Sequence, residues 1–136
     1  MYDTYLLAMM AVQEVNAAGY VIKEENLVNE LHHCIQEMYE KSQVNQLGSC
    51  LKDVIATALG KFTALGLLKA RIYPSETGSH TTWLTSPKEQ KEGIDLLYQQ
   101  LTEVNSLSKD QLRVAGEAVN SAVEKSLVMH LSYPRL

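Results

Sequence analysis

Apolar residues recur at helical spacing in the middle of the chain, between residues 49 and 68. The larger apolar side chains lie one, three or four residues apart, so they share one side of a helix. They are Leu51, Val54, Ile55, Ala58, Leu59, Phe62 and Leu65. Gly66 follows directly, where a glycine can take the left-handed conformation that ends a helix. The pattern predicts an amphipathic helix that presses one face into a core and stops at Gly66.

The period changes after this helix. Residues 67–73 and 80–85 read LLKARIY and HTTWLT, which are typical of two strands. Pro-Ser-Glu-Thr-Gly-Ser lies between them and favours a turn. The two segments predict a β-hairpin. Trp83 and Tyr73 could stack on a ligand, but we expect them to hold the hairpin against the core.

Two helices are expected before the central one. The first covers residues 3–17 and ends at Gly19. The second begins near Lys23, where two glutamates favour a helix N-terminus. Residues 20–22 are a short extended link and a candidate third strand beside the hairpin. The expected inward residues are Leu6, Met9, Val12 and Val15 in the first helix and Leu27, Val28, Leu31, Cys34, Ile35 and Met38 in the second.

Two more helices are expected after the hairpin. Residues 86–89, Ser-Pro-Lys-Glu, combine a capping serine, a first-turn proline and a glutamate three residues after the cap. This helix continues to Val104. Residues 108–111 repeat the serine-to-glutamine capping pattern and open a last helix, which residues 133–134 stop. The expected inward residues are Ile94, Leu97, Leu101 and Val104, then Leu112, Ala115, Val119, Ala122, Val123 and Leu127.

The order of elements predicts one mainly α domain over residues 1–136. A helix that ends in glycine and leads directly into a hairpin is the third helix and wing of a winged-helix unit. The expected fold is therefore winged-helix-like, with three helices, a β-hairpin and two further helices. Residues 1–104 would form its core unit and residues 105–136 its C-terminal helix, while residues 42–48 form a polar connector.

Composition narrows the function classes. The net charge of −4 and the pI of about 5.5 argue against a nucleic-acid surface, which usually carries excess Lys and Arg. The longest apolar run, residues 5–12, is far shorter than the roughly 20 residues that span a bilayer. No cationic segment precedes it, so we expect no signal peptide. Cys34 and Cys50 lie on apolar helical stripes, as expected of reduced buried thiols in an intracellular, reducing compartment.

Candidate chemistry is sparse. His32, His33 and Cys34 are adjacent in a predicted helix, where neighbouring side chains point about 100° apart and cannot converge on one ion. His33 and Glu37 are four residues apart and could share a metal, but two ligands do not complete a site. The sequence has no Gly-x-Ser-x-Gly, Cys-x-x-Cys or glycine-rich phosphate loop. We therefore expect no metal, no cofactor and no catalytic residue.

The outward face of the central helix is a poor surface for DNA. Lys52 and Lys61 on this face are partly offset by Asp53, and no Arg, Asn or Gln there could read base edges. The hairpin adds a few basic residues, which are Lys69, Arg71 and His80. We therefore expect nucleic-acid binding to be absent.

The same face suggests a protein contact. Ala56, Gly60 and Ala64 recur every four residues beside Lys61, and small side chains let another helix or backbone approach closely. Helix propensity alone could also place alanines here. Gly60 favours docking, since a mid-helix glycine is destabilising by roughly 1 kcal/mol relative to alanine. The candidate docking face is Ala56, Gly60, Lys61 and Ala64.

Two segments carry a family resemblance. The first is residues 22–28, Ile-Lys-Glu-Glu-Asn-Leu-Val, at the start of the second predicted helix. The second runs from Val54 to the end of the central helix. It contains Gly-Lys-Phe at residues 60–62 and Gly-Leu-Leu at residues 66–68. This resembles the C-terminal region of the membrane-bound glycerol-3-phosphate acyltransferases of mitochondria and bacteria. There, too, a similar helix start leads to a helix ending in Gly-Lys-Phe-x-x-x-Gly-Ile-Leu. The resemblance covers residues 20–104.

The resembled family transfers a fatty acyl group from acyl-coenzyme A to the 1-position of glycerol 3-phosphate. Its general base is the histidine of a His-x-x-x-x-Asp motif. Five positions after the histidines of this chain stand Glu37, Met38, Thr85 and Arg135, so no catalytic residue is carried over. The resemblance implies a non-catalytic accessory domain or fragment that packs on the catalytic domain of the same or a partner chain. Only through such an enzyme would it be associated with the mitochondrial outer or bacterial inner membrane; otherwise it would be cytoplasmic.

A second resemblance gives the alternative. The hairpin followed by capped helices from residues 86 and 108 is similar to winged-helix regulators of the MarR type, which dimerise through terminal helices and bind DNA. The acidic charge and the face of the central helix argue against this reading. A protein-interaction module unrelated to either family also fits the sequence.

Overall fold

The computed structural model describes residues 2–38, 51–74, 78–104 and 107–128. These residues form five α-helices and a small antiparallel sheet, in the predicted order of three helices, a hairpin and two helices. The elements are α1 (Tyr2–Ala18), β1 (Ile22–Lys23), α2 (Glu24–Met38), α4 (Leu51–Ala64), β2 (Lys69–Pro74), β3 (His80–Thr85), a 3-10 turn (Lys88–Gln90), α5 (Lys91–Val104) and α6 (Lys109–Val128). The mainly helical fold is thus confirmed. The predictions for residues 42–48, 133–134 and Cys50 lie outside the described residues.

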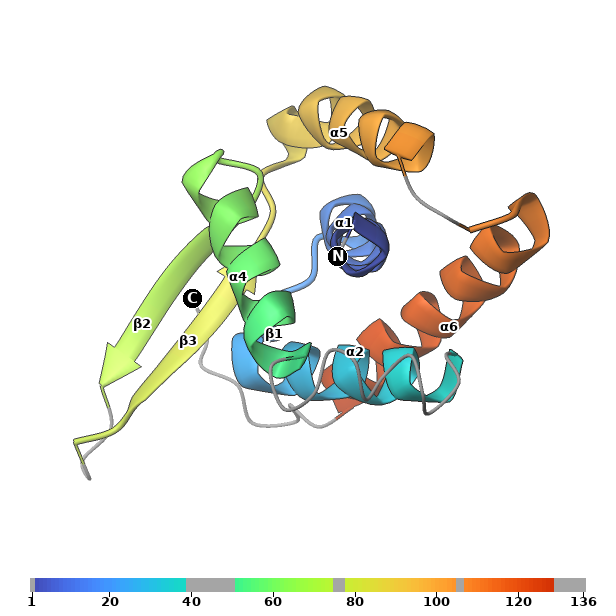
Figure 1. Ribbon diagram of the computed structural model, residues 1–136. Coiled ribbons are helices and arrows are strands. Elements are labelled where there is room, and N and C mark those ends of the chain that lie inside the picture. The colour runs from blue at the N-terminus through green and yellow to red at the C-terminus, as the bar shows by residue number, and fades with distance from the viewer. Residues whose placement is uncertain (1, 39–50, 75–77, 105–106, 129–136) are drawn as a thin grey trace.

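Helix α1 is the centre of the domain. Figure 1 looks along its axis and shows α5, α6, α2 and α4 arranged around it, with the sheet to one side. Every residue from Leu6 to Val12 is buried. Only four of the α1 positions were predicted to face inward, whereas a helix that is apolar on all sides packs against neighbours on all sides.

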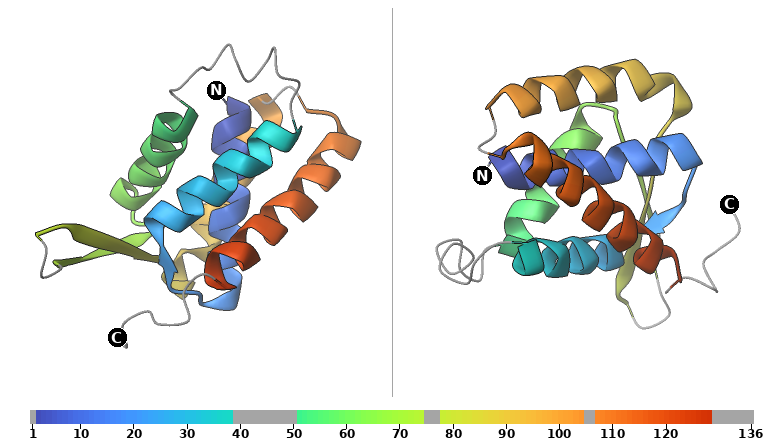
Figure 2. Two further views of the ribbon diagram at one scale, coloured as in Figure 1. Left: turned by 90° about the horizontal axis from the view of Figure 1, so that it is seen from below. Right: turned by 90° about the vertical axis from the view of Figure 1, so that its right-hand side faces the viewer.

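The sheet has the strand order β1-β3-β2, with both pairings antiparallel. Ile22 pairs with Leu84 and Lys23 with Trp83, so the predicted third strand is confirmed, but at Ile22–Lys23 instead of residues 20–22. The predicted hairpin is confirmed, with register from Lys69↔Thr85 to Pro74↔His80. The paired strands β2 and β3 extend away from the helices (Figure 2).

Gly66 ends α4 as predicted, with φ +84°. Leu67 N–H donates to Phe62 O and Gly66 N–H donates to Thr63 O, both at 3.0 Å. This pair of bonds is the Schellman motif, which satisfies carbonyl groups left over at a helix end. Gly19 ends α1 with φ +69°, also as predicted.

Two residues that were predicted to face the core are exposed instead. Leu65 is 64% exposed because α4 ends at Ala64, so Leu65 no longer continues the buried side of the helix. Val104 is 55% exposed because it is the last residue of α5, one turn beyond the buried Leu101. The other predicted inward residues that the structure describes are buried or half-buried.

Ser86 does not cap a helix, which corrects the prediction for residues 86–89. A 3-10 turn precedes α5, its N-cap position is Pro87, and no side chain makes a cap hydrogen bond there. Ser86 is instead buried, and its hydroxyl donates to Leu67 O at 2.7 Å. The second capping prediction is confirmed: Ser108 N–H donates to Gln111 Oε1, and Gln111 N–H donates to Ser108 Oγ.

Helix α6 completes the same core as the preceding helices. Its residues Ala115, Val119, Ala122 and Val123 are buried within the core cluster that contains α1. It packs against both α1 and α2. Among the helices described, none is long and apolar enough to cross a membrane.

Candidate functional site

The predicted docking face lies on the uncovered side of α4. Gly60, Lys61 and Ala64 are exposed and Ala56 is half-buried. A Cβ atom built on Gly60 would meet nothing within 4 Å. The fold of the described chain therefore does not require a glycine at this position, and the face offers a partner a small, open surface.

Lys61 of this face contacts helix α1. Its Nζ lies 5.3 Å from the centre of the Tyr5 ring, a cation–π geometry. The Tyr5 ring in turn meets Phe62 edge-on, with 6.3 Å between ring centres. These contacts hold the Lys61 stem beside α1 and leave the Gly60 surface uncovered.

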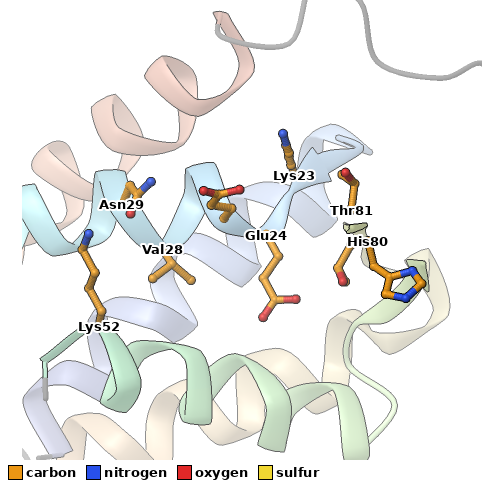
Figure 3. Close-up of a pocket in the computed structure, with 9 residues that line it drawn as sticks. Lys23, Glu24, Val28, Asn29, Lys52, His80 and Thr81 are labelled. Carbon is orange, nitrogen blue, oxygen red and sulfur yellow. The ribbon is translucent and has the colours of Figure 1, made fainter. Parts of the chain in front are cut away.

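The structure also contains a polar groove that sequence reasoning missed. It has a volume of about 370 Å³ between the start of α2, the start of α4 and β3. In Figure 3 the Glu24 carboxylate points into the space between α2 and α4, with Lys52 on one side and His80 on the other. Val28 lies beside them on α2 (Figure 3). These residues come from segments far apart in the sequence, so no local motif could have identified the groove.

The groove has no dominant charge. Lys23, Lys52 and His80 stand against Glu24 and Glu25 along its walls. Partial burial raises the pKa of Glu24 above its usual value, because water is removed from the charged form. The groove offers hydrogen-bond donors and acceptors of both signs, which suits a polar protein surface better than a phosphate backbone.

His32, His33 and Cys34 form a cluster on α2. His33 is exposed, His32 is half-buried and Cys34 is buried. The rings of His32 and His33 meet edge-on, with 6.0 Å between their centres. Desolvation lowers the pKa of His32, and the charges of Lys52 and His33 lower it further. Throughout the described part of the chain, no three or more His, Cys, Asp or Glu residues are grouped so that they could hold a metal.

Cys34 is a buried thiol, as predicted. Desolvation raises its pKa to about 11, with a further contribution from Glu37 and an opposing one from Lys125 of α6. Its Sγ lies 3.8 Å from Met38 Sδ. A thiol with so high a pKa is almost wholly protonated at neutral pH and is a weak nucleophile.

The hairpin aromatics do not form an open stacking surface. Trp83 is 6% exposed and Tyr73 is half-buried. Trp83 is flanked in the sheet by Lys23 and Arg71. Trp83 is buried but does not belong to the core cluster that contains its neighbour Leu84, so the prediction that it holds the hairpin against the core stays a prediction.

The structure thus presents the docking face on α4 and a polar groove between α2, α4 and β3, and it brings the rings of His32 and His33 into edge-on contact on α2. No protein-family model, curated protein or solved structure matches this chain.

Proposed function

We propose that this chain is a non-catalytic, winged-helix-like accessory domain of a glycerol-3-phosphate acyltransferase, and that it packs on the catalytic domain through α4. The element order α1-β1-α2-α4-β2-β3 and the strand order β1-β3-β2 support the winged-helix interpretation. The resemblance of residues 20–104 supports the enzyme family. The docking face carries the contact.

Gly60 is the observation on which this proposal rests. It lies within α4, where glycine is destabilising by roughly 1 kcal/mol relative to alanine, and it is exposed, with open space where a side chain would lie. An exposed mid-helix glycine that packs against no described residue leaves room for close approach from outside, whereas Gly116 of α6 is half-buried. Ala64, one turn further on, is also exposed and extends this small surface.

A non-catalytic role agrees with the sequence around the histidines. No histidine of the chain is followed five residues later by aspartate. His32 and Glu37 come nearest to the motif, but residues five apart on α2 point to different sides of the helix. The acyl transfer itself would therefore belong to the catalytic domain.

The test mixes this chain with the separately expressed acyltransferase domain, identified by His-x-x-x-x-Asp, from the same genome. Sedimentation velocity should show a complex with the wild-type chain. Gly60→Arg should abolish the complex by placing a long side chain in the contact. Gly116→Arg on α6 is the matched control, because a Cβ at Gly116 also meets nothing within 4 Å. Thermal unfolding verifies that both variants fold.

Absence of a wild-type complex, or equal loss of binding in the two arginine variants, would reject the docking proposal. Acyltransfer activity is measured in the same mixtures. The chain alone should show none, and the enzyme should be more stable or more active when the wild-type chain is bound.

A winged-helix DNA-binding regulator is the second candidate function. The observation in its favour is the pair of exposed basic residues on the hairpin next to α4, Lys69 and Arg71. A regulator should be a stable dimer whose DNA affinity falls steeply as salt rises. A titration with mixed-sequence duplex DNA at several salt concentrations, together with the oligomeric state, separates it from the accessory domain.

A further inference from the structure

Strand β2 is the outer strand of the sheet on the side away from β1. It pairs with β3 over its whole length, and no described strand pairs with its other edge. Every second residue of such a strand directs its N–H and C=O away from the sheet. Five of its six residues are exposed, and Tyr73 is half-buried. The backbone along this edge is therefore open to another strand.

The two faces of β2 differ in chemistry. Successive side chains of a strand point to opposite faces of the sheet. Lys69, Arg71 and Tyr73 therefore share one face, and Ala70 and Ile72 share the other. Ala70 is paired with Leu84 of β3, which is buried in the core. The face of the sheet that carries Ala70 and Ile72 is therefore the face that packs against the helices at β3. The helices do not cover this face at β2, where Ile72 is 64% exposed.

The edge is cationic, although the chain as a whole carries a net charge of −4. Neither Lys69 nor Arg71 belongs to the ion pairs found among the described residues, which join Lys91 to Asp95 and Arg113 to Glu117. The adjacent strand β3 reads His-Thr-Thr-Trp-Leu-Thr and supplies no carboxylate. Among the described residues neither cation is held in an ion pair, so both can meet the carboxylates of a partner.

We propose that the free edge of β2 binds an extended segment of a partner protein that carries acidic side chains on one face and apolar side chains on the other. The added strand would continue the sheet through backbone hydrogen bonds. Its carboxylates would lie across from Lys69 and Arg71, and an apolar side chain would cover Ile72. This surface is separate from the docking face on α4, so the inference does not depend on the proposed function.

A second copy of the chain fits this edge poorly. Pairing β2 with another β2 would bring Lys69 and Arg71 close to the same cations of the copy, and like charges facing each other are destabilising. Charged residues on edge strands oppose unwanted pairing in this way. The same charges favour an acidic strand as the occupant.

The test uses a short capped peptide of alternating glutamate and valine, labelled for fluorescence anisotropy, with the full chain. We expect saturable binding that Lys69→Glu/Arg71→Glu weakens about tenfold or more. The control Lys88→Glu/Lys109→Glu makes the same charge change at exposed residues on other elements and should bind as the wild type does. Hydrogen exchange should slow at β2 amides when the peptide binds. A peptide N-methylated at alternate residues should not bind, because it keeps the charge and loses the backbone donors.

Four results would overturn the inference. No saturable binding would mean that the cations serve only to keep the edge free. Equal binding of the N-methylated peptide would reduce the interaction to charge attraction. Tighter binding of a DNA oligonucleotide of equal charge would assign the edge to nucleic acid. Concentration-dependent self-association with protection of β2 amides would assign it to a second copy. Gly60→Arg should leave peptide binding unchanged, which keeps this test distinct from that of the docking face.

Discussion

Asn16 at the end of α1 donates a hydrogen bond from Nδ2 to Ser86 Oγ at 2.9 Å, although the two residues are 70 positions apart. The same amide group donates to Pro87 O at 2.8 Å, and the Ser86 hydroxyl donates to Leu67 O at 2.7 Å. Both side chains are buried. This chain of bonds joins the end of α1, the turn after α4 and the connection from β3 to α5.

Removing either side chain should destabilise the domain. We expect Ser86→Ala and Asn16→Leu each to lower the free energy of unfolding by about 1–3 kcal/mol, since each leaves buried partners unsatisfied. The double variant should lose clearly less than the sum of the two single losses, as measured by urea unfolding. Ser108→Ala, which removes an exposed cap worth about 1 kcal/mol, is the control and should add to Ser86→Ala. Simple additivity of Asn16→Leu and Ser86→Ala would contradict the coupling.

Glycine substitutions should separate a conformational role from a surface role. Gly60→Ala should raise the free energy of unfolding by about 0.5–1 kcal/mol, because the helix gains and the new methyl group meets open space. Gly66→Ala should lower it by about 1–2 kcal/mol, because φ is +84° there. Gly116→Ala on α6 is the matched control for Gly60 and should also be stabilising. A destabilising Gly60→Ala would show that the domain itself needs this glycine, and the docking argument would lose its support.

Cys34 should react slowly in the native protein. Its pKa of about 11 leaves little thiolate at pH 8, so we expect alkylation by iodoacetamide to be about two orders of magnitude slower than in denaturant. The rate is measured in a Cys50→Ser background, so that one thiol is followed. A native rate near the denatured rate would show that Cys34 is not buried as described.

His32 should make the domain less stable in acid. Its pKa is lowered from the ordinary 6.5 in the folded state, so the unfolded chain binds the proton more tightly. The stability associated with neutral His32 is thus present at higher pH and is lost as the pH falls through about 6.5 and below. We expect the urea midpoint to depend less on pH in His32→Gln than in the wild type.

The control for this prediction is His80→Gln, which removes an exposed imidazole from β3. A reduced pH dependence in His32→Gln that His80→Gln does not reproduce would assign the effect to His32. Lys52→Gln should reduce the dependence in part, since Lys52 is one cause of the lowered pKa of His32. Identical curves for His32→Gln and the wild type would reject the assignment.

Features with local chemistry were predictable from the sequence. Gly66 ends its helix by its own conformational freedom, and Ser108 caps through a partner three residues away. Ser86 looked equally convincing as a cap, but its hydroxyl is bound by Asn16 and Leu67, which lie 70 and 19 residues away. A sequence pattern contains no information about such distant competitors.

The candidate site also has a part that the sequence could predict and a part that it could not. The small, exposed face around Gly60 belongs to a single helix, so its spacing was visible in the sequence. The polar groove required Glu24, Lys52 and His80 to meet from three elements, and only the tertiary structure brings them together. Exposure at helix ends, as at Leu65 and Val104, also depends on where neighbouring elements stop.

The central position of α1 has a consequence for how the chain is made. Among the described helices α1 leaves the ribosome first, yet the helices that cover it continue to the end of α6 at residue 128. Until α6 is synthesised, part of the apolar surface of residues 6–12 has no cover and is prone to aggregation or chaperone binding. The core can close only after α6 has emerged, so folding of this domain is expected to follow its translation rather than accompany it.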